Sequence, residues 1–187
     1  MNIISVDIET TGLDPNRHQI LSISACTLDE KEPKVFYQQI AYAEYAITPK
    51  AMQANQIDVR NWGGLEERTV ASEFTIWLNN CFDNLDPIYG LGFSVGSFDL
   101  AFLKRMYEKY NMVYPFHHQA IDLDTCLLLL NIKRNTIDTE SLLRNKLDTN
   151  PFLAAQVAKH KSFNNRSFCE SIINGLVWKF LRKDLIC

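Results

Sequence analysis

The sequence contains no apolar run long enough to cross a membrane. Its longest uninterrupted run extends only from Cys126 to Leu130, whereas a spanning helix needs about 20 apolar residues. The first residues carry no basic stretch ahead of an apolar segment, so no secretory signal is expected. An excess of positive charge is also missing, since 19 Lys and Arg against 22 Asp and Glu give a net charge of −3. A broad basic face that holds nucleic acid by neutralising phosphates is therefore not expected, although a small basic rim is compatible with this balance.

Neither a disulfide framework nor a zinc knuckle is expected. The five cysteines are odd in number, widely spaced and never in a CxxC arrangement, and four of them have apolar neighbours. They are Cys26, Cys81, Cys126, Cys169 and Cys187. Reduced structural thiols of this kind, in a chain without a membrane segment, predict a cytoplasmic protein.

No internal repeat, low-complexity tract or Gly/Ser/Pro-rich linker divides the chain. Apolar residues make up 47% of it and charged residues 22%. These values are close to those of an average soluble globular protein, and they exclude a disordered chain, a collagen-like chain and a coiled coil. We expect one domain that spans residues 1–187.

Apolar and β-branched runs separated by turn clusters predict strands at 2–8, 20–28 and 35–42. The short connections between these strands indicate an antiparallel meander. Helical periodicity begins at Thr48-Pro49, a cap followed by a first-turn proline. The later segments expected are helices at 66–82, 98–110, 141–147 and 167–181 and a strand at 87–93. This order of elements predicts an α/β domain with a mixed sheet.

Two carboxylates, Asp7 and Glu9, lie two residues apart where the first strand runs out. Residues with this spacing point to the same side of a strand, so the two side chains converge. Two anions so close need a proton, a cation or a metal, and oxygen ligands favour a hard divalent ion such as Mg²⁺ or Mn²⁺. Solvated acids at the end of a strand explain the spacing equally well, and both interpretations remain open.

A third acid, Asp99, begins an amphipathic helix directly after a strand and a glycine-containing turn. An acid at the start of a helix is favoured by capping and by the helix dipole. By itself, Asp99 is therefore more simply explained by helix stability than by function.

Taken together, these segments resemble the DEDD superfamily of 3′→5′ exonucleases, which have the ribonuclease H-like fold. Val6 to Leu13 looks like the first motif of the superfamily, and Ser97 to Leu103 looks like the second. Ile47 to Ile57 is similar to its P-x-A segment, and Asp122 to Thr125 resembles the D-T that follows the second motif. The second half is also similar to the ribonuclease T-like branch. The resemblance implies an α/β fold with a mixed five-stranded sheet, an initial antiparallel meander and flanking helices.

The resemblance also implies a metal site. Asp7, Glu9 and Asp99, with Glu170 as a fourth acid, match the positions at which the family binds two catalytic ions, Mg²⁺ or Mn²⁺. The ions would also explain how a net-acidic protein binds a polyanion, because they carry the local positive charge.

Substrate contacts are implied as well. Thr10 and Leu13 match positions that contact the terminal nucleotide, through backbone groups and through a wedge against the base. Phe93, Phe98 and Phe102 could stack on bases, although the helical spacing of Phe98 and Phe102 favours core packing. A modest basic rim could form from Lys104, Arg105, Lys109, Lys159, Lys161 and Arg166, although charges at such positions usually only solvate a surface.

The third motif departs from the usual form, a His followed five residues later by the fourth Asp. The matching positions here are Asn165 and Glu170. Glu can hold a metal, but its extra methylene shifts the oxygens, and a misplacement of about 1 Å can cost about 10²-fold in rate. Asn165 cannot accept the proton of the attacking water, and a general base contributes about 10²–10⁴-fold.

Two replacements for the general base remain open. His160 lies five residues before Asn165 in a segment that could bring it to the metals. Alternatively, the metal alone could suffice by lowering the pKa of its bound water. The simpler interpretation of His160 is an exposed loop histidine.

The sequence therefore predicts a two-metal 3′→5′ exonuclease that releases nucleoside monophosphates from the ends of single-stranded DNA or RNA. The alternative is a weak or inactive protein of the same fold that binds nucleic acid or a protein partner. The expected partners are single-stranded 3′ ends and no membrane, and a homodimer or a polymerase or replication partner is left open.

Overall fold

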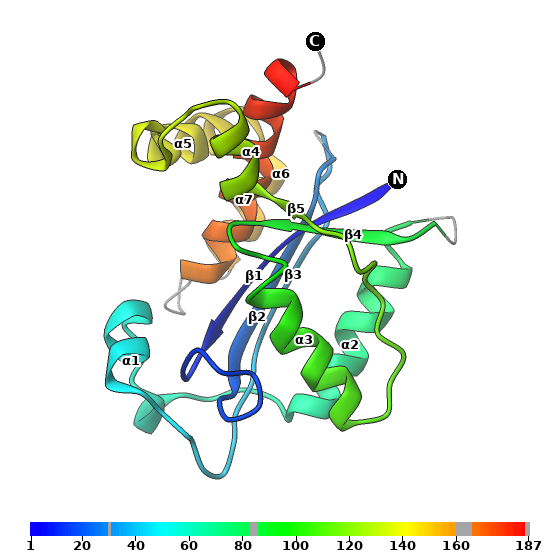
Figure 1. Ribbon diagram of the computed structural model, residues 1–187, viewed down its shortest axis with the longest axis vertical. Coiled ribbons are helices and arrows are strands. Elements are labelled where there is room, and N and C mark those ends of the chain that lie inside the picture. The colour runs from blue at the N-terminus through cyan, green and yellow to red at the C-terminus, as the bar shows by residue number, and fades with distance from the viewer. Residues whose placement is uncertain (30, 83–85, 160–165, 186–187) are drawn as a thin grey trace.

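The computed structural model describes residues 1–29, 31–82, 86–159 and 166–185. A central sheet crosses the protein, and helices lie against both of its faces (Figure 1). In the described residues, no helix is both long and apolar enough to span a membrane.

The sheet has five strands in the order β3-β2-β1-β4-β5. Their bounds are β1 (Asn2–Thr10), β2 (Ile20–Thr27), β3 (Val35–Gln39), β4 (Ile88–Gly92) and β5 (Ile121–Asp122). Strands β1, β2 and β3 pair antiparallel, whereas β4 and β5 extend the sheet in parallel. The expected meander and the mixed five-stranded sheet are both confirmed.

Seven α-helices and two short 3-10 helices are present in the described residues. The helices are α1 (Pro49–Asn55), α2 (Glu67–Asn79), α3 (Asp99–Lys109), α4 (Leu123–Leu129), α5 (Thr139–Thr149), α6 (Pro151–Lys159) and α7 (Arg166–Leu185). The 3-10 helices are η1 (Val59–Asn61) and η2 (Arg134–Thr136). As expected, the Thr48 side chain caps α1 by accepting a hydrogen bond from Ala51 N–H, and Pro49 takes the first helical position.

The side chains of β1 alternate between the two faces of the sheet, and the two faces have different surroundings. Ile4, Val6 and Ile8 are buried in the core formed with α2 and α3. Side chains in between point to the other face, where Ser5 Oγ donates a hydrogen bond to the Ser171 carbonyl oxygen of α7 at 2.5 Å. The acids of β1 therefore project on the side of the sheet that α7 covers.

Helix α7 is buried on more sides than a single apolar stripe predicts. Ile172 packs with Leu176, but Phe180, at the same helical spacing, is 49% exposed. Val177 and Leu181 are buried instead, against β4 and α4. The helix lies between the sheet and the other helices of this side (Figure 1), so its buried surface is wider than one stripe.

Strand β3 and helix α6 both differ from the sequence-based expectation. Strand β3 ends at Gln39 rather than at Tyr42, and directly after it the chain bridges to Leu65, whose N–H donates to the Gln39 carbonyl and whose carbonyl accepts from Ala41 N–H. Helix α6 was not expected, and it begins at Pro151 directly after Asn150, whose Oδ1 accepts from Leu153 N–H at 2.9 Å.

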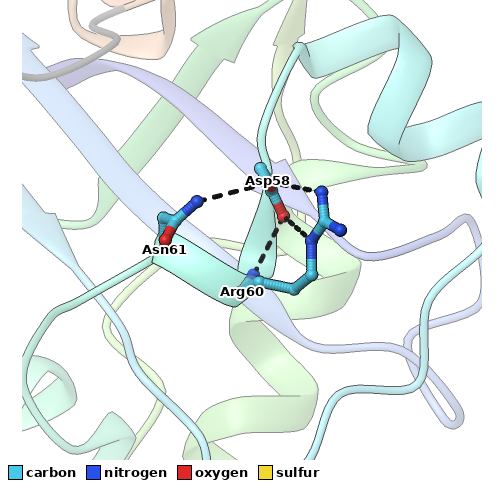
Figure 2. A network of polar contacts seen from close by, with 3 residues as sticks. All are labelled: Asp58, Arg60 and Asn61. Carbon is cyan, nitrogen blue, oxygen red and sulfur yellow. Dashed lines mark hydrogen bonds and ion pairs between the residues drawn. The ribbon is translucent and has the colours of Figure 1, made fainter.

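The chain between α1 and α2 is shaped by a cluster around Asp58. Figure 2 shows its carboxylate accepting hydrogen bonds from the Arg60 backbone N–H and guanidinium and from the Asn61 amide. These bonds lower the pKa of Asp58 to about 2 and cap η1. The turn is therefore closed locally, within four residues of the chain.

The described cysteines are all free thiols, as expected: Cys26, Cys81, Cys126 and Cys169. Burial raises the pKa of Cys26 to about 12, so its thiolate is scarce at neutral pH. This environment fits a structural role.

Candidate active site

A cavity of about 240 Å³ opens where β1 ends, between α1, α3 and α7. It brings together segments from across the sequence. Its lining includes Asp7, Glu9, Thr10, Leu13, Ala51, Asn55, Phe93, Phe98, Asp99, Arg134, Glu170 and Asn174. All four acids expected at the metal site, and all three residues expected to contact substrate, thus line one cavity.

Asp7 and Glu9 reach the cavity because of their strand spacing. Both are half-buried on β1. The pairing of β1 with β2 shifts register between Glu9 and Thr10, where Glu9 faces Ser22 but Thr10 faces Ile20. A bulge of this kind bends a strand and redirects its side chains, and it lies where Glu9 and Thr10 line the cavity.

Asp99 is the most buried of the four acids, with 5% of its surface exposed. It is the first residue of α3, and its Oδ1 accepts a hydrogen bond from Ile8 N–H of β1 at 3.0 Å. The pKa of Asp99 is raised to about 7, mainly by burial and in addition by the charges of Glu9 and Glu170, while backbone hydrogen bonds oppose the rise. The Asp99 carboxyl therefore links α3 to β1, in addition to its favourable interaction with the dipole of α3.

Glu170 lies on α7, and the neighbouring Ser171 holds that helix against the sheet. Ser171 is fully buried, and its Oγ lies 2.6 Å from Ser24 Oγ of β2. Its carbonyl accepts from Ser5 of β1. Small side chains at this contact let the helix approach the sheet closely, and Asn174, one turn beyond Glu170, lines the same cavity.

The chemistry of this donor set fits a hard divalent cation. All four acids supply oxygen ligands, which Mg²⁺ and Mn²⁺ prefer. Within the described residues, no three Asp, Glu, His or Cys side chains are already grouped closely enough to hold an ion. Like charges repel, so a cation or a proton is needed to draw these carboxylates together.

The residues expected to contact substrate lie at the mouth and wall of the cavity. Leu13 is 72% exposed, which fits a wedge. Thr10 is buried, and its hydroxyl donates to the Gly12 carbonyl at 2.7 Å, so this hydroxyl shapes the turn. The Phe98 ring lines the cavity while it packs on buried Phe102, with ring centroids 5.1 Å apart.

His160, the candidate general base, and Asn165, which stands at the usual histidine position, lie outside the described residues, and their roles stay predictions. The expected basic rim does not form at the cavity in the described part of the chain. Arg105 pairs with Glu108, and Lys109 pairs with Glu67 on α2. The side chains of Lys159, Lys161 and Arg166 are outside the described part.

Arg134, Asn55 and Asn174 are cavity residues that sequence reasoning did not assign to the site. Asn55 Nδ2 donates to the Thr10 carbonyl at 3.0 Å, which ties α1 to the end of β1. Asn174 could have been found from its position four residues after Glu170 on one helix face. Arg134 lies in a segment without periodicity, so no local signal points to it.

The sequence of this protein matches the family model of the RNase H superfamily over residues 4–149. The chain therefore belongs to the RNase H superfamily, which confirms the expected fold class. The match ends before α7, so Glu170 lies beyond it.

Individual relatives are exonucleases. The 3′-5′ DNA exonuclease Cap18 of Escherichia coli is 28% identical over 122 residues, which make up 64% of each chain. E. coli exonuclease I in complex with a dT13 oligonucleotide has the same fold, with a TM-score of 0.63 and 18% identity over 98% of this chain. A product-bound exonuclease I structure matches with a TM-score of 0.62 over 97% of this chain at 18% identity. The chain spans 42% and 43% of these two structures. The expected resemblance to 3′→5′ exonucleases is confirmed.

Proposed function

We propose that this protein is a metal-dependent 3′→5′ exonuclease that removes nucleoside monophosphates from single-stranded DNA. One observation carries the proposal: Asp7, Glu9, Asp99 and Glu170, drawn from three elements, line a single cavity with an exposed leucine at its mouth. Four acids in one cavity have no value for packing, because burial of carboxylates is costly unless they are paired or bind a metal.

DNA is the proposed substrate because of the relatives. Cap18 is a DNA exonuclease by name, and the exonuclease I structures hold DNA oligonucleotides. The cavity volume of about 240 Å³ fits one nucleotide better than a duplex. We therefore propose single-stranded 3′ ends as the binding partner. We also propose that the protein acts in the cytoplasm. A homodimer and a replication partner stay predictions.

The four carboxylates would hold two Mg²⁺ or Mn²⁺ ions, which supply positive charge at the phosphodiester and lower the pKa of water. The chain itself positions the substrate and the acids. Ile8 N–H holds the Asp99 carboxyl in place. Leu13 and Phe98 supply apolar surface beside the acids, where the terminal base can pack and exclude water.

A second candidate function follows from the third motif. Asn165 occupies the place of the usual histidine, and an amide cannot act as a general base. A protein that keeps the metal site but lacks an effective base would bind single-stranded ends and cleave them slowly or not at all.

A cleavage time course tests the proposal. A 5′-labelled single-stranded DNA and its RNA counterpart are incubated with the protein in Mn²⁺, Mg²⁺ or EDTA. We expect a ladder that shortens from the 3′ end, depends on the metal and is stronger with DNA. Asp7→Ala should lower the rate by about 10³-fold or more, because it removes an acid of the metal site.

Asp148→Ala is the matched control, since Asp148 is an exposed acid on α5 outside the cavity. Cleavage that persists in EDTA or in Asp7→Ala would refute the proposal. Absence of cleavage with Mn²⁺ binding detected by calorimetry, and lost in Asp7→Ala, would select the second candidate.

A further inference from the structure

Arg134 is the one cationic residue among the described residues that line the acidic cavity. It begins η2, in the segment between α4 and α5, two helices that Figure 1 labels. A phosphate that approaches a cavity lined by carboxylates is repelled. A guanidinium at the rim of the cavity therefore offsets part of this repulsion and favours the binding of a phosphate there.

The guanidinium is held by groups from two elements. Its Cζ lies 3.7 Å from the centroid of the Phe93 ring, well within cation–π range. Its Nη1 lies 3.7 Å from Asp124 Oδ1 of α4. The other oxygen of Asp124 accepts a hydrogen bond from Ser94 Oγ at 2.9 Å, and Ser94 has a left-handed backbone with φ of 52°. The turn after β4 and the start of α4 thus together hold the Arg134 side chain in place.

These contacts leave donors for a ligand. The 3.7 Å separation from Asp124 is longer than a hydrogen bond. Within the described residues the guanidinium makes no hydrogen bond, and the Arg134 side chain is 60% exposed. Arginine carries five N–H donors in a planar fork that matches a phosphate. The contact with the Phe93 ring uses none of these donors in a conventional hydrogen bond.

A purely structural role explains these contacts less well. An ion pair between two side chains as exposed as Arg134 and Asp124 contributes little to stability. The arginine also lies at a cavity whose other ionisable side chains are acids, and its positive charge there would favour the approach of a polyanion.

We infer that Arg134 binds a backbone phosphate of the single-stranded substrate at the rim of the cavity, with Phe93 and Asp124 as positioning residues. The inference rests on the proposed function. It assigns phosphate binding to a side chain of the protein, in addition to the acids that would hold metal.

The test measures kcat and KM on single-stranded DNA in Mn²⁺ at several salt concentrations. Arg134→Ala should raise KM about tenfold, the loss of one charged hydrogen-bonded contact, with kcat changed by less than about twofold. The slope of log KM against log salt should fall by about 0.7, the value for one phosphate contact on a single strand. Arg134→Lys should keep most of the slope, because it keeps the charge.

Arg144→Ala is the matched control, since Arg144 is an exposed arginine on α5 that pairs with Glu140 and does not line the cavity. An unchanged KM and salt slope in Arg134→Ala would overturn the inference. Equal losses in the Ala and Lys variants at an unchanged slope would also overturn it, because they would indicate stacking on a base.

Failure of the proposed function is recognised separately, as absence of cleavage by the wild-type protein. In that case, binding of a fluorescein-labelled oligonucleotide in EDTA measures the same salt slope without catalysis. A lower slope in Arg134→Ala then supports the inference, and an equal slope or no binding by the wild-type protein refutes it.

Discussion

Asp99 is the residue at the cavity whose pKa shift has the largest effect on stability. Its carboxyl is buried and lies near Glu9 and Glu170, and its pKa is raised to about 7. An acid whose pKa is higher in the folded state than in the unfolded state keeps its proton longer when folded. The free energy of unfolding therefore falls as pH rises from about 4 to about 7, and the full penalty remains above that range.

Asp99→Asn should remove this pH dependence. The amide oxygen can still accept from Ile8 N–H, and it carries no charge. At pH 8 we expect the variant to be more stable than the wild type by about 2–4 kcal/mol, since each unit of pKa shift corresponds to about 1.4 kcal/mol. At pH 4 the two should be nearly equal. Urea unfolding at both pH values measures the difference.

Asp58→Asn is the control for that experiment. Asp58 is an acid whose pKa is lowered to about 2 by its hydrogen bonds. Its contribution to stability is lost only as pH falls from about 4 toward 2. The slope between pH 4 and pH 8 should therefore match the wild type. A wild-type slope in Asp99→Asn would contradict the prediction.

At the scale of elements, the turn between β1 and β2 determines the position of Leu13. Thr11 N–H donates to the Gln19 carbonyl at 2.9 Å, which closes the turn. Inside it, Asp14 N–H donates to His18 Nδ1 at 3.1 Å. The imidazole lies against the Gly12 backbone, so close that a Cβ on Gly12 would fall 2.3 Å from its Cδ2. A side chain at residue 12 would therefore force the His18 ring to move.

Gly12→Ala should therefore displace His18 and move Leu13 at the mouth of the cavity. We expect KM for single-stranded DNA to rise by about tenfold or more, since a shift of about 1 Å in a binding group costs this much or more. The melting temperature should fall by only a few degrees, about 1 kcal/mol in a chain of this size, because the His18 ring that must move is only half-buried.

The double variant Gly12→Ala/His18→Ala makes that prediction specific. Removal of the ring opens the space that the new methyl group needs. The second substitution should therefore return KM toward the value of His18→Ala alone. Additive effects on KM in this double-mutant cycle would exclude the steric explanation.

At the scale of the whole molecule, periodicity predicted the scaffold well. The alternation of β1 placed Asp7 and Glu9 on one face, and Thr48-Pro49 fixed the start of α1. These features depend on neighbours in the sequence. Arg134 was missed because its place at the cavity depends on the path of the chain from β4 through α3 and β5 to η2. The raised pKa of Asp99 was also out of reach, since burial is a property of the packed molecule.

The same dependence on packing predicts how the folded molecule responds to metal. Folding brings the four acids to one cavity, and the unfolded chain separates them. A divalent ion that binds only the folded state stabilises it by about 2.7 kcal/mol at a hundredfold excess over its Kd. For a chain of this length, that corresponds to a rise of about 5–11 °C in melting temperature.

The rise should depend on pH, because an ion competes with protons for carboxylates. The pKa of Asp99 near 7 means that its carboxyl is mostly protonated at pH 5 and ionised at pH 8. We therefore expect Mn²⁺ to raise the melting temperature more at pH 8 than at pH 5, with EDTA reversing the change and NaCl of equal ionic strength giving none of it. Asp7→Ala should lose the response at both pH values. An equal response in that variant would place the ion elsewhere and remove the chemical basis for the proposed nuclease site.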